Sequence, residues 1–380
     1  MKKFIRSCSA VVFSCALAFS AVGVIPANAA EVPVEQVTGI IEEAKEATAA
    51  FVKSTPTQTD LKINAELPMI GDISADVSFV DDPANKAAIV TSTLSDDEQG
   101  PSTAYIDTKN KYAYYTNPES GRIEVADSQS IEGLTKMLSD FDILPLAPIA
   151  TFSMGETKVI DGETCQELIV NVDLDKEKIA QYGELISKAL ADASSSPFKN
   201  LFSGKGLGSL ISGDDLSNSM TELHLEIKTC INQDKVLKQA VTTCSAKVIM
   251  LDVEMPISFN ADITTKAVDA VVEIPQEMID NAKPAAGLSK TESGLTYKSV
   301  ISGKNTVFQV TKTSKATAKK ITVPATVNLC GKTVKVTKAS KNAFSKAKKL
   351  KTLVIKNSTL KKAVKKNPKK YGLSKKVKIK

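Results

Sequence analysis

His224 is the only histidine in this 380-residue chain, so any chemistry that needs an imidazole depends on this one residue. Polar and apolar residues alternate around it, and Glu222, Glu226 and Lys228 share its side of an expected strand. A serine or cysteine hydrolase would need a nucleophile beside it, and the chain lacks the Gly-x-Ser-x-Gly motif of a nucleophile elbow. We therefore expect a solvated surface imidazole and a protein that is not an enzyme.

Two short segments look like cation or phosphate loops but lack residues that those ligands need. Residues 173–177 begin like a calcium loop, but Lys178 stands where the invariant glycine is required. Residues 204–208 are rich in glycine, but no Gly-Lys-Ser/Thr follows, as a phosphate-binding loop would require. One histidine and a few scattered cysteines do not suggest a zinc site. The sequence thus predicts no catalytic residue, no bound metal and no cofactor.

Lysine dominates the C-terminal region, where residues 301–380 hold 24 lysines and no Asp, Glu, Arg or His. The whole chain has 49 basic and 43 acidic residues, which leaves the first 300 residues with 25 basic groups against 43 acidic ones and a net charge of −18. This asymmetry predicts an anionic partner, because uncompensated lysines repel one another. The alternative is a solvated lysine face that only aids solubility. The candidate polyanion-binding residues are Lys346, Lys348, Lys349, Lys361, Lys362, Lys365, Lys366, Lys369 and Lys370.

The composition of this region also selects among anionic partners. Nucleic acid is not expected, because the region has no arginine for paired base contacts and only Phe308, Phe344 and Tyr371 for stacking on bases. An anionic cell-wall polymer or an acidic surface protein fits better, and the acidic half of the chain is a further candidate.

The N-terminus has the three parts of a secretory signal peptide over residues 1–29. Positive charge comes first, an apolar stretch follows, and residues 27–29 match the small-x-small cleavage pattern. Cys15 as the lipidated residue of a lipoprotein signal is the alternative, but the bulky Phe13 fits such a motif poorly. Beyond the signal, no stretch approaches the ~18 apolar residues of a membrane helix, so we expect an exported protein with no transmembrane segment after signal removal.

Export permits disulfides among the four cysteines of the mature chain, and Cys165 and Cys230 are the best candidates. Both fall on polar faces of strands that are expected to be antiparallel neighbours. If Asp173 aligns with Thr221 or Glu222, the two cysteines come close to opposite each other, within disulfide reach.

The alternative is that all four cysteines stay reduced. Cys244 shares an apolar strand face and is expected to be a buried thiol. Cys330 precedes Gly331 in a turn and is expected to be free.

The spacing of apolar residues predicts one helix followed by many short strands. Apolar residues recur at helical spacing over residues 37–52, and strict alternation over residues 61–79 predicts a hairpin. Further helices are expected over residues 130–139 and 176–193. Further strands are expected over residues 88–94, 102–107, 111–116, 122–125, 157–160, 164–173, 221–231, 236–251, 257–263 and 270–274. The prediction is an α+β fold with one curved antiparallel half-barrel sheet covered by a few helices.

Residues 194–219 are rich in Ser and Gly and are expected to form a long loop. This loop nevertheless carries six large apolar residues: Phe198, Leu201, Phe202, Leu207, Leu210 and Ile211. They are either a segment tucked onto the core or an apolar flap at the mouth of a ligand cavity.

The first helix and its strands are followed by a tyrosine-rich hairpin at residues 111–115. Further along the chain, residues 162–168 have the sequence Gly-Glu-Thr-Cys-Gln-Glu-Leu and lead into a helix. This order of elements resembles the half-barrel lipoprotein-carrier superfamily, in its uncharacterised surface-protein branch from Gram-positive bacteria. The resemblance implies a cavity for acyl chains between sheet and helices, and hence a lipid or other apolar ligand. It also implies a secreted or cell-surface protein of a Gram-positive bacterium.

The lysine-rich region contains short β patterns, which a disordered polycation would lack. Three segments resemble the BspA-type leucine-rich repeats of bacterial surface proteins: "ITVPATV" at residues 321–327, "GKTVKVT" at residues 331–337 and "KLKTLVI" at residues 349–355. The resemblance implies a small repeat module for adhesion or wall association. The expected domains are a signal peptide (1–29), a half-barrel (30–284), a linker (285–297) and the lysine-rich module (298–380).

These features predict an exported, non-enzymatic binding protein. The half-barrel would hold an apolar ligand or partner, and the basic region would tether it to anionic polymers of the cell envelope. The alternative is a structural surface adhesin whose half-barrel has a filled core and no small-molecule ligand.

Overall fold

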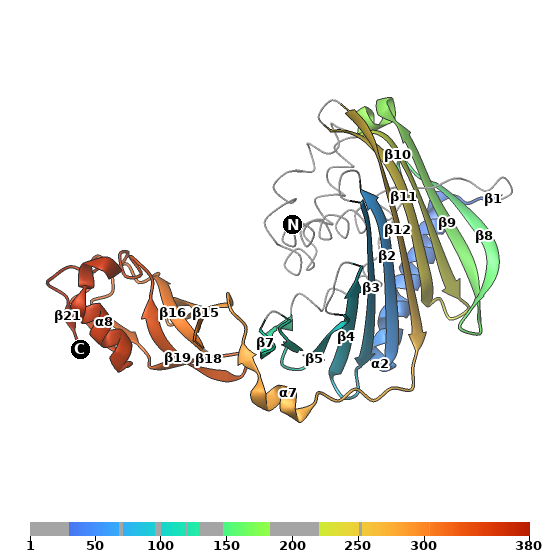
Figure 1. Cartoon of the computed structure of the whole chain (residues 1–380). Helices are drawn as coiled ribbons and strands as arrows, with labels where there is room; N and C mark the ends of the chain where they lie inside the picture. Colours follow the sequence, from blue (N-terminus) through green and yellow to red (C-terminus); the bar gives the residue numbers. More distant parts are fainter. Residues whose placement is uncertain are drawn as a thin grey trace. The chain divides into compact units, whose positions relative to one another are not determined.

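The structure is a computed structural model that describes residues 30–67, 71–95, 100–118, 120–128, 147–182, 220–250, 253–303 and 305–380 (Figure 1). Three predictions fall outside these residues: the signal peptide, the helix over residues 130–139 and the apolar loop residues. Those loop residues are Phe198, Leu201, Phe202, Leu207, Leu210 and Ile211.

The chain divides into two compact units. The first comprises Met1–Lys111 and Ser128–Ile274, and the second comprises Tyr112–Asp127 and Pro275–Lys380. A hairpin from the middle of the chain therefore belongs with the C-terminal region. Each unit has a hydrophobic core of its own.

Helix α2 (Val34–Ser54) forms because apolar residues recur every three or four positions and gather on one side, as predicted. Its buried residues are Val37, Ile41, Ala44 and Thr48. The helix ends where Pro56 follows Thr55, because the residue before a proline is driven out of the helical region, and Thr55 is extended. The helix lies along one face of the sheet (Figure 1), where Val37 and Ile41 join the core.

The described part of the first unit contains ten strands in the order β1-β8-β9-β10-β11-β12-β2-β3-β4-β5, each antiparallel to its neighbours. The fold-class prediction of a curved antiparallel sheet with a few helices is confirmed. The strands are β1 (Ala30–Glu31), β2 (Thr57–Leu67), β3 (Gly71–Asp82), β4 (Ala87–Leu94), β5 (Ser102–Asp107), β8 (Thr151–Ile160), β9 (Glu163–Asp175), β10 (Met220–Asn232), β11 (Leu237–Met250) and β12 (Val253–Ala267).

The sheet has two unlike faces because polar and apolar residues alternate along its strands. Leu225 pairs with Val172 and with Cys244, and all three are buried. The neighbouring residues Glu226 and Thr243 pair with each other on the opposite side. We call the side of Leu225 the apolar face and the side of Thr243 the polar face.

One predicted strand is absent. Residues 270–274 form no strand, since β12 ends at Ala267 and the following backbone bonds elsewhere. The Val268 N–H donates to the Pro56 carbonyl at 3.0 Å, and the Val272 N–H donates to the Asp82 carboxylate at 3.0 Å. These bonds satisfy the backbone without a ladder.

In the second unit, β6 (Tyr112–Thr116) and β7 (Ile123–Asp127) form an antiparallel hairpin, and β13 (Lys283–Pro284) runs parallel to β7. Helix α7 (Gln276–Asn281) precedes β13. A five-stranded sheet follows in the order β14-β15-β16-β19-β18. Its strands are β14 (Ser289–Glu292), β15 (Leu295–Ser302), β16 (Asn305–Thr313), β18 (Thr326–Leu329) and β19 (Lys332–Ala339).

Residues 285–297 were expected to be a linker, but they contain β14 and the start of β15. Leu295 has no exposed surface and belongs to the core of the second unit. The segment is therefore part of a sheet, because its alternating residues find a partner strand in β16.

Three parallel strands, β17 (Lys320–Val323), β20 (Thr352–Ile355) and β21 (Lys378–Ile379), complete the second unit. Helix α8 (Ser358–Lys366) and the 3-10 helix η3 (Pro368–Tyr371) lie between β20 and β21 in the chain. The inward residues of the ladder are nearly or fully buried: Ile321, Val323, Leu353 and Ile355. The Asn357 side chain caps α8 by accepting from the Leu360 N–H at 3.1 Å.

Candidate functional site

The apolar face of the first unit is where the half-barrel prediction places a ligand cavity. Its described side chains are packed against one another and against α2, and Val170 and Ile227 have no exposed surface. Cys244 belongs to this cluster, which confirms the predicted buried thiol. The face therefore has the character of a packed core in the part of the chain that the structure describes.

An ion pair between the buried Lys238 and the partly exposed Glu163 lies at one end of this face. The Lys238 ammonium lies 2.5 Å from the Glu163 carboxylate and 4.9 Å from the centre of the Phe51 ring of α2. Burial pushes the pKa of Glu163 up, but hydrogen bonds from Lys238 and Asn232 outweigh it and hold that pKa below its ordinary value. These contacts fix the end of α2 to β11.

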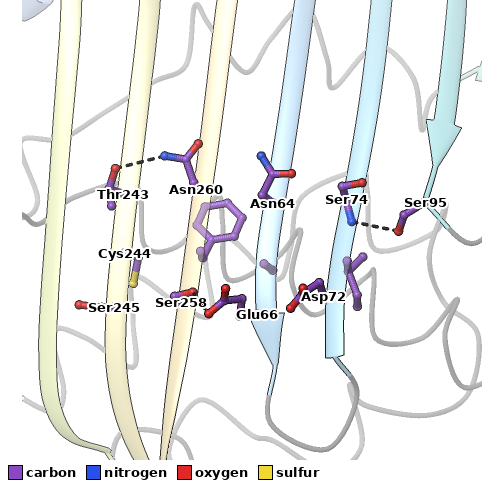
Figure 2. Close-up of a pocket in the computed structure, with 13 residues that line it drawn as sticks. Asn64, Glu66, Asp72, Ser74, Ser95, Thr243, Cys244, Ser245, Ser258 and Asn260 are labelled. Atoms are coloured by element: carbon purple, nitrogen blue, oxygen red, sulfur yellow. Dashed lines mark hydrogen bonds between the residues drawn. The ribbon is translucent and has the colours of Figure 1, made fainter.

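The polar face carries an open depression of about 430 Å³ across β11, β12, β2 and β3 (Figure 2). The register of the strands places its polar residues in two rows. One row is Thr243, Asn260, Asn64 and Ser74, and the other is Ser245, Ser258, Glu66 and Asp72. Sequence alternation indicates that these residues share a face with their strand neighbours, but only the register brings the four strands together.

Most polar groups in the depression are hydroxyls and amides, with two carboxylates at one end. The Asn260 amide donates to the Thr243 hydroxyl at 3.2 Å, and the Ser258 hydroxyl donates to the Glu66 carboxylate at 3.3 Å. Glu66 and Asp72 are exposed and stand directly opposite each other on β2 and β3. Like charges in this position are destabilising, and neither carboxylate has a basic partner among the described residues.

His224 lies on the polar face, as predicted, but it is held between two carboxylates. Its Nδ1 is 2.7 Å from Asp173 and its Nε2 is 2.6 Å from Glu222. Lys247 contacts the same Glu222, and the hydrogen bonds from Lys247 and then His224 lower the pKa of that carboxyl. Ser245 pairs with His224 across the strands, but Nε2 faces Glu222. The arrangement therefore lacks the base-to-nucleophile hydrogen bond of a serine hydrolase.

The predicted bond between Cys165 and Cys230 is absent: none of the four described cysteines is in a disulfide, and all four are buried. Asp173 pairs with His224 and not with Thr221 or Glu222 as predicted, so Cys230 pairs with Glu167 and Cys165 pairs with Asn232. The two cysteines are thus diagonal neighbours, and diagonal positions lie about 7–8 Å apart, beyond ordinary disulfide separations. Burial, followed by the charge of Glu167, raises the pKa of Cys230 to about 11.

Cys330 is free in a turn, as predicted, and it is also buried. It has a positive φ and directly precedes Gly331, which joins β18 to β19. Burial raises the pKa of its thiol to about 11. Neither Cys230 nor Cys330 is therefore activated as a nucleophile.

The predicted polyanion-binding lysines lie on α8, on η3 and in the turns of residues 341–350. All are exposed except Lys361, which is half-buried. The turns run beside η3, where the Asn342 N–H donates to the Lys370 carbonyl at 2.9 Å. Gly372 permits this approach, because its φ is +78° and a Cβ there would come within 2.8 Å of Ser345.

The parallel strands bring together further lysines that the sequence did not single out. Lys320 and Lys378 are exposed and flank Thr352 in register, and Lys356 and Lys380 follow on β20 and β21. The lysines of residues 341–380 form no ion pair with any described carboxylate. Each strand shows the alternation of lysine and apolar residues, but which strands are neighbours depends on the fold.

Within the described residues, no set of three or more His, Cys, Asp or Glu side chains is arranged to hold a metal ion. Of the described helices, none is both long and apolar enough to cross a bilayer.

No family model matches the sequence, and no curated protein matches it. A LolA superfamily protein from Nitrosomonas europaea matches in structure at 9% identity and a TM-score of 0.22, covering 62% of this chain and 94% of that chain. A structure of lipovitellin matches at 9% identity and a TM-score of 0.25, covering 58% of this chain and 26% of that chain. A DUF1329 family protein from Desulfovibrio piger matches at 8% identity and a TM-score of 0.15, covering 62% and 95%.

These matches amount to a distant structural similarity to half-barrel folds, which is the coarse part of the predicted resemblance. The aligned part spans about a quarter of the lipovitellin chain. At such identities and TM-scores, the similarity does not bear on ligand or partner.

Proposed function

We propose that this is an exported, non-enzymatic binding protein whose lysine-rich region tethers it to anionic polymers of a bacterial cell envelope. The observation that carries the proposal is the set of exposed lysines on α8, on η3 and in the turns of residues 341–350, which have no carboxylate partner in the described chain. A polyanion supplies the missing counter-charge, and each lysine that it neutralises releases condensed counterions. The signal-peptide pattern supports a secreted or cell-surface location, and the family resemblance supports a Gram-positive one.

The test measures binding to isolated Gram-positive cell-wall fragments as salt is raised. One full-length variant replaces the four lysines of α8: Lys361→Gln, Lys362→Gln, Lys365→Gln and Lys366→Gln. The matched control replaces four exposed lysines of the first unit: Lys53→Gln, Lys62→Gln, Lys109→Gln and Lys176→Gln. Wild type and control should bind with a steep loss on adding salt, and the α8 variant should bind at least about tenfold more weakly with a shallower salt dependence. Equal binding and equal salt response of the two variants would refute this role for α8.

For the first unit, we propose an apolar ligand or partner at the apolar face. The support is the size of the sheet and the continuous apolar surface that α2 only partly covers: Met154, Tyr182 and Ile257 at its margin are only partly buried. The alternative, a surface adhesin with a filled core, is favoured by the near-complete burial of residues such as Val170, Leu225 and Phe259.

Native mass spectrometry of the purified mature protein separates these two candidates. A bound lipid, seen as extra mass that organic extraction removes, supports the ligand. A protein that carries the polypeptide mass alone and takes up no apolar fluorescent probe supports the adhesin.

A further inference from the structure

The polar face of the first unit has more acid than base near the depression. Strands β12, β2 and β3 place five carboxylates on this face: Asp60, Glu66, Asp72, Asp76 and Asp262. Lys62 stands in register between Asp262 and Asp76. The face is solvent-exposed, since Asn64, Glu66 and Asp72 are all exposed, so it is open to a partner.

We propose that this polar face docks the lysines of α8 from a second copy of the protein, head to tail. The occupant is chosen by charge, because the same chain carries a segment with many lysines and no acidic residue. Among the described residues, Glu66 and Asp72 have no basic partner and the α8 lysines have no acidic one, so each surface can supply the counter-charge of the other. The inference goes beyond the proposed function, since it needs no envelope polymer.

The spacing of charges on the two surfaces is compatible. Burial of Leu360 and Val364 leaves Lys362, Lys365 and Lys366 of α8 exposed and Lys361 half-buried. Lysines four positions apart on a helix are separated by about 6 Å along its axis. Glu66 and Asp72, directly opposite on neighbouring strands, have Cβ atoms about 5 Å apart. One pair of helix lysines can therefore face the carboxylate pair, with the hydroxyls and amides of the depression beside it (Figure 2).

Docking also relieves a strain within the sheet. Glu66 and Asp72 repel each other in the free protein, and a lysine placed between them removes that repulsion. Because the two surfaces differ, the contact is heterologous, and one copy can engage two others to give open chains.

The test is sedimentation velocity of full-length mature protein over a range of concentrations, at about 50 mM and about 500 mM salt. The face variant is Glu66→Gln with Asp72→Asn. The matched control is Glu273→Gln with Asp269→Asn, two exposed carboxylates of the first unit beyond the other end of β12. The lysine variant is the four-residue α8 variant described above.

Wild type and control should associate with concentration at low salt and separate at high salt. The face variant should associate roughly tenfold more weakly, because it loses two charge pairs. It should unfold at an unchanged or slightly higher temperature and bind cell walls as wild type does. The face variant keeps the α8 lysines, and the lysine variant keeps the polar face. A mixture of the two should therefore form dimers and no larger species, because only one complementary contact remains.

Three results would overturn the inference: a wild type that stays monomeric at low salt, a face variant that associates as the control does, or a mixture that forms no dimer. A compaction of wild type that is independent of concentration would also overturn it, since the contact would then lie within one chain. Loss of cell-wall binding by the lysine variant tests the tether separately, so either idea can fail alone.

Discussion

The two units manage charge in different ways. In the first unit, acidic and basic side chains meet, as Lys228 does with Glu226 at 2.6 Å and Lys238 with Glu163 at 2.5 Å. In the second unit, the last 40 residues carry lysines and no carboxylate side chain, and a compact core under them opposes their mutual repulsion. The first unit therefore pairs part of its charge internally, although the first 300 residues keep a net charge of −18, whereas the lysines of the last 40 residues depend on ions or partners from outside.

The largest expected effect comes from weakening the core beneath the lysines of the second unit, which tests whether the two units differ in stability. Leu353 has no exposed surface and stands between Ile321 and Ile379 in the parallel ladder. Leu353→Ala should cost about 3 kcal/mol, through lost burial and the cavity left behind. In calorimetry, the melting transition of the second unit should fall while that of the first stays in place.

Val354→Ala is the matched control, because Val354 is only half-buried on the outward side of the same strand. Its cost should stay below about 1 kcal/mol. If Leu353→Ala shifts both transitions equally, the units unfold together and the comparison does not hold for stability.

Within the first unit, Asp81 is a carboxylate that forms no ion pair with any described basic residue. Burial, then repulsion by Asp82, raises its pKa to about 6. A folded-state pKa above the unfolded value means that stability falls as pH rises from about 4 to about 6. Asp81→Asn should therefore stabilise the first unit by about 1–2 kcal/mol near neutral pH and change little near pH 4.

Thermal unfolding of wild type and Asp81→Asn at both pH values measures this effect. Asp76→Asn, on the exposed polar face of the same strand, is the control and should show no such pH-dependent gain. An equal gain at both pH values would show that the ionisation of Asp81 is not the cause.

Added salt should change the melting temperatures of the two units by different but smaller amounts. Screening weakens repulsion among the lysines of the second unit, so its melting temperature should rise by roughly 2–5 °C between about 50 mM and about 500 mM salt. The first unit should shift less, because some of its acidic and basic side chains already pair with each other and salt weakens those pairs as well. Scanning calorimetry at both salt concentrations checks this, and a larger rise of the first transition would reverse the comparison.

The last prediction concerns the thiols of Cys230 in the first unit and Cys330 in the second, both of which have a raised pKa. Cys230 and Cys330 should react with a thiol reagent near pH 8 roughly 100-fold more slowly in the native protein than ordinary exposed thiols, because their raised pKa leaves little thiolate. Four thiols should be titrated in the mature protein after denaturation without reductant. Two thiols fewer would reinstate the bond between Cys165 and Cys230.

Local patterns in the sequence were sufficient for most elements of the fold. Alternation predicted the hairpin of β2 and β3, and helical spacing predicted α2, because these periods express which side of an element is buried. The short β patterns of the lysine-rich region likewise became β16, β17, β19 and β20. Alternation failed at residues 270–274, where a side chain and a loop carbonyl, rather than a strand, satisfy the backbone.

Register was decided only by the tertiary structure. A shift of two residues keeps every side chain on the same face, so the pattern alone could not distinguish Cys230 opposite Glu167 from Cys230 opposite Cys165. The same limit applies to the depression, whose two rows exist only because four strands align their polar residues.

The sequence by itself determined the charge of each region and the two-faced character of the sheet. The tertiary structure decided which distant segments are neighbours. It paired β17, which begins at Lys320, with β20, and it paired β20 with β21, which begins at Lys378. It also placed the hairpin of residues 112–127 in the C-terminal unit. The physical reason is that the type of each residue sets its charge and its tendency to be buried, whereas strand pairing depends on backbone hydrogen bonds along whole strands.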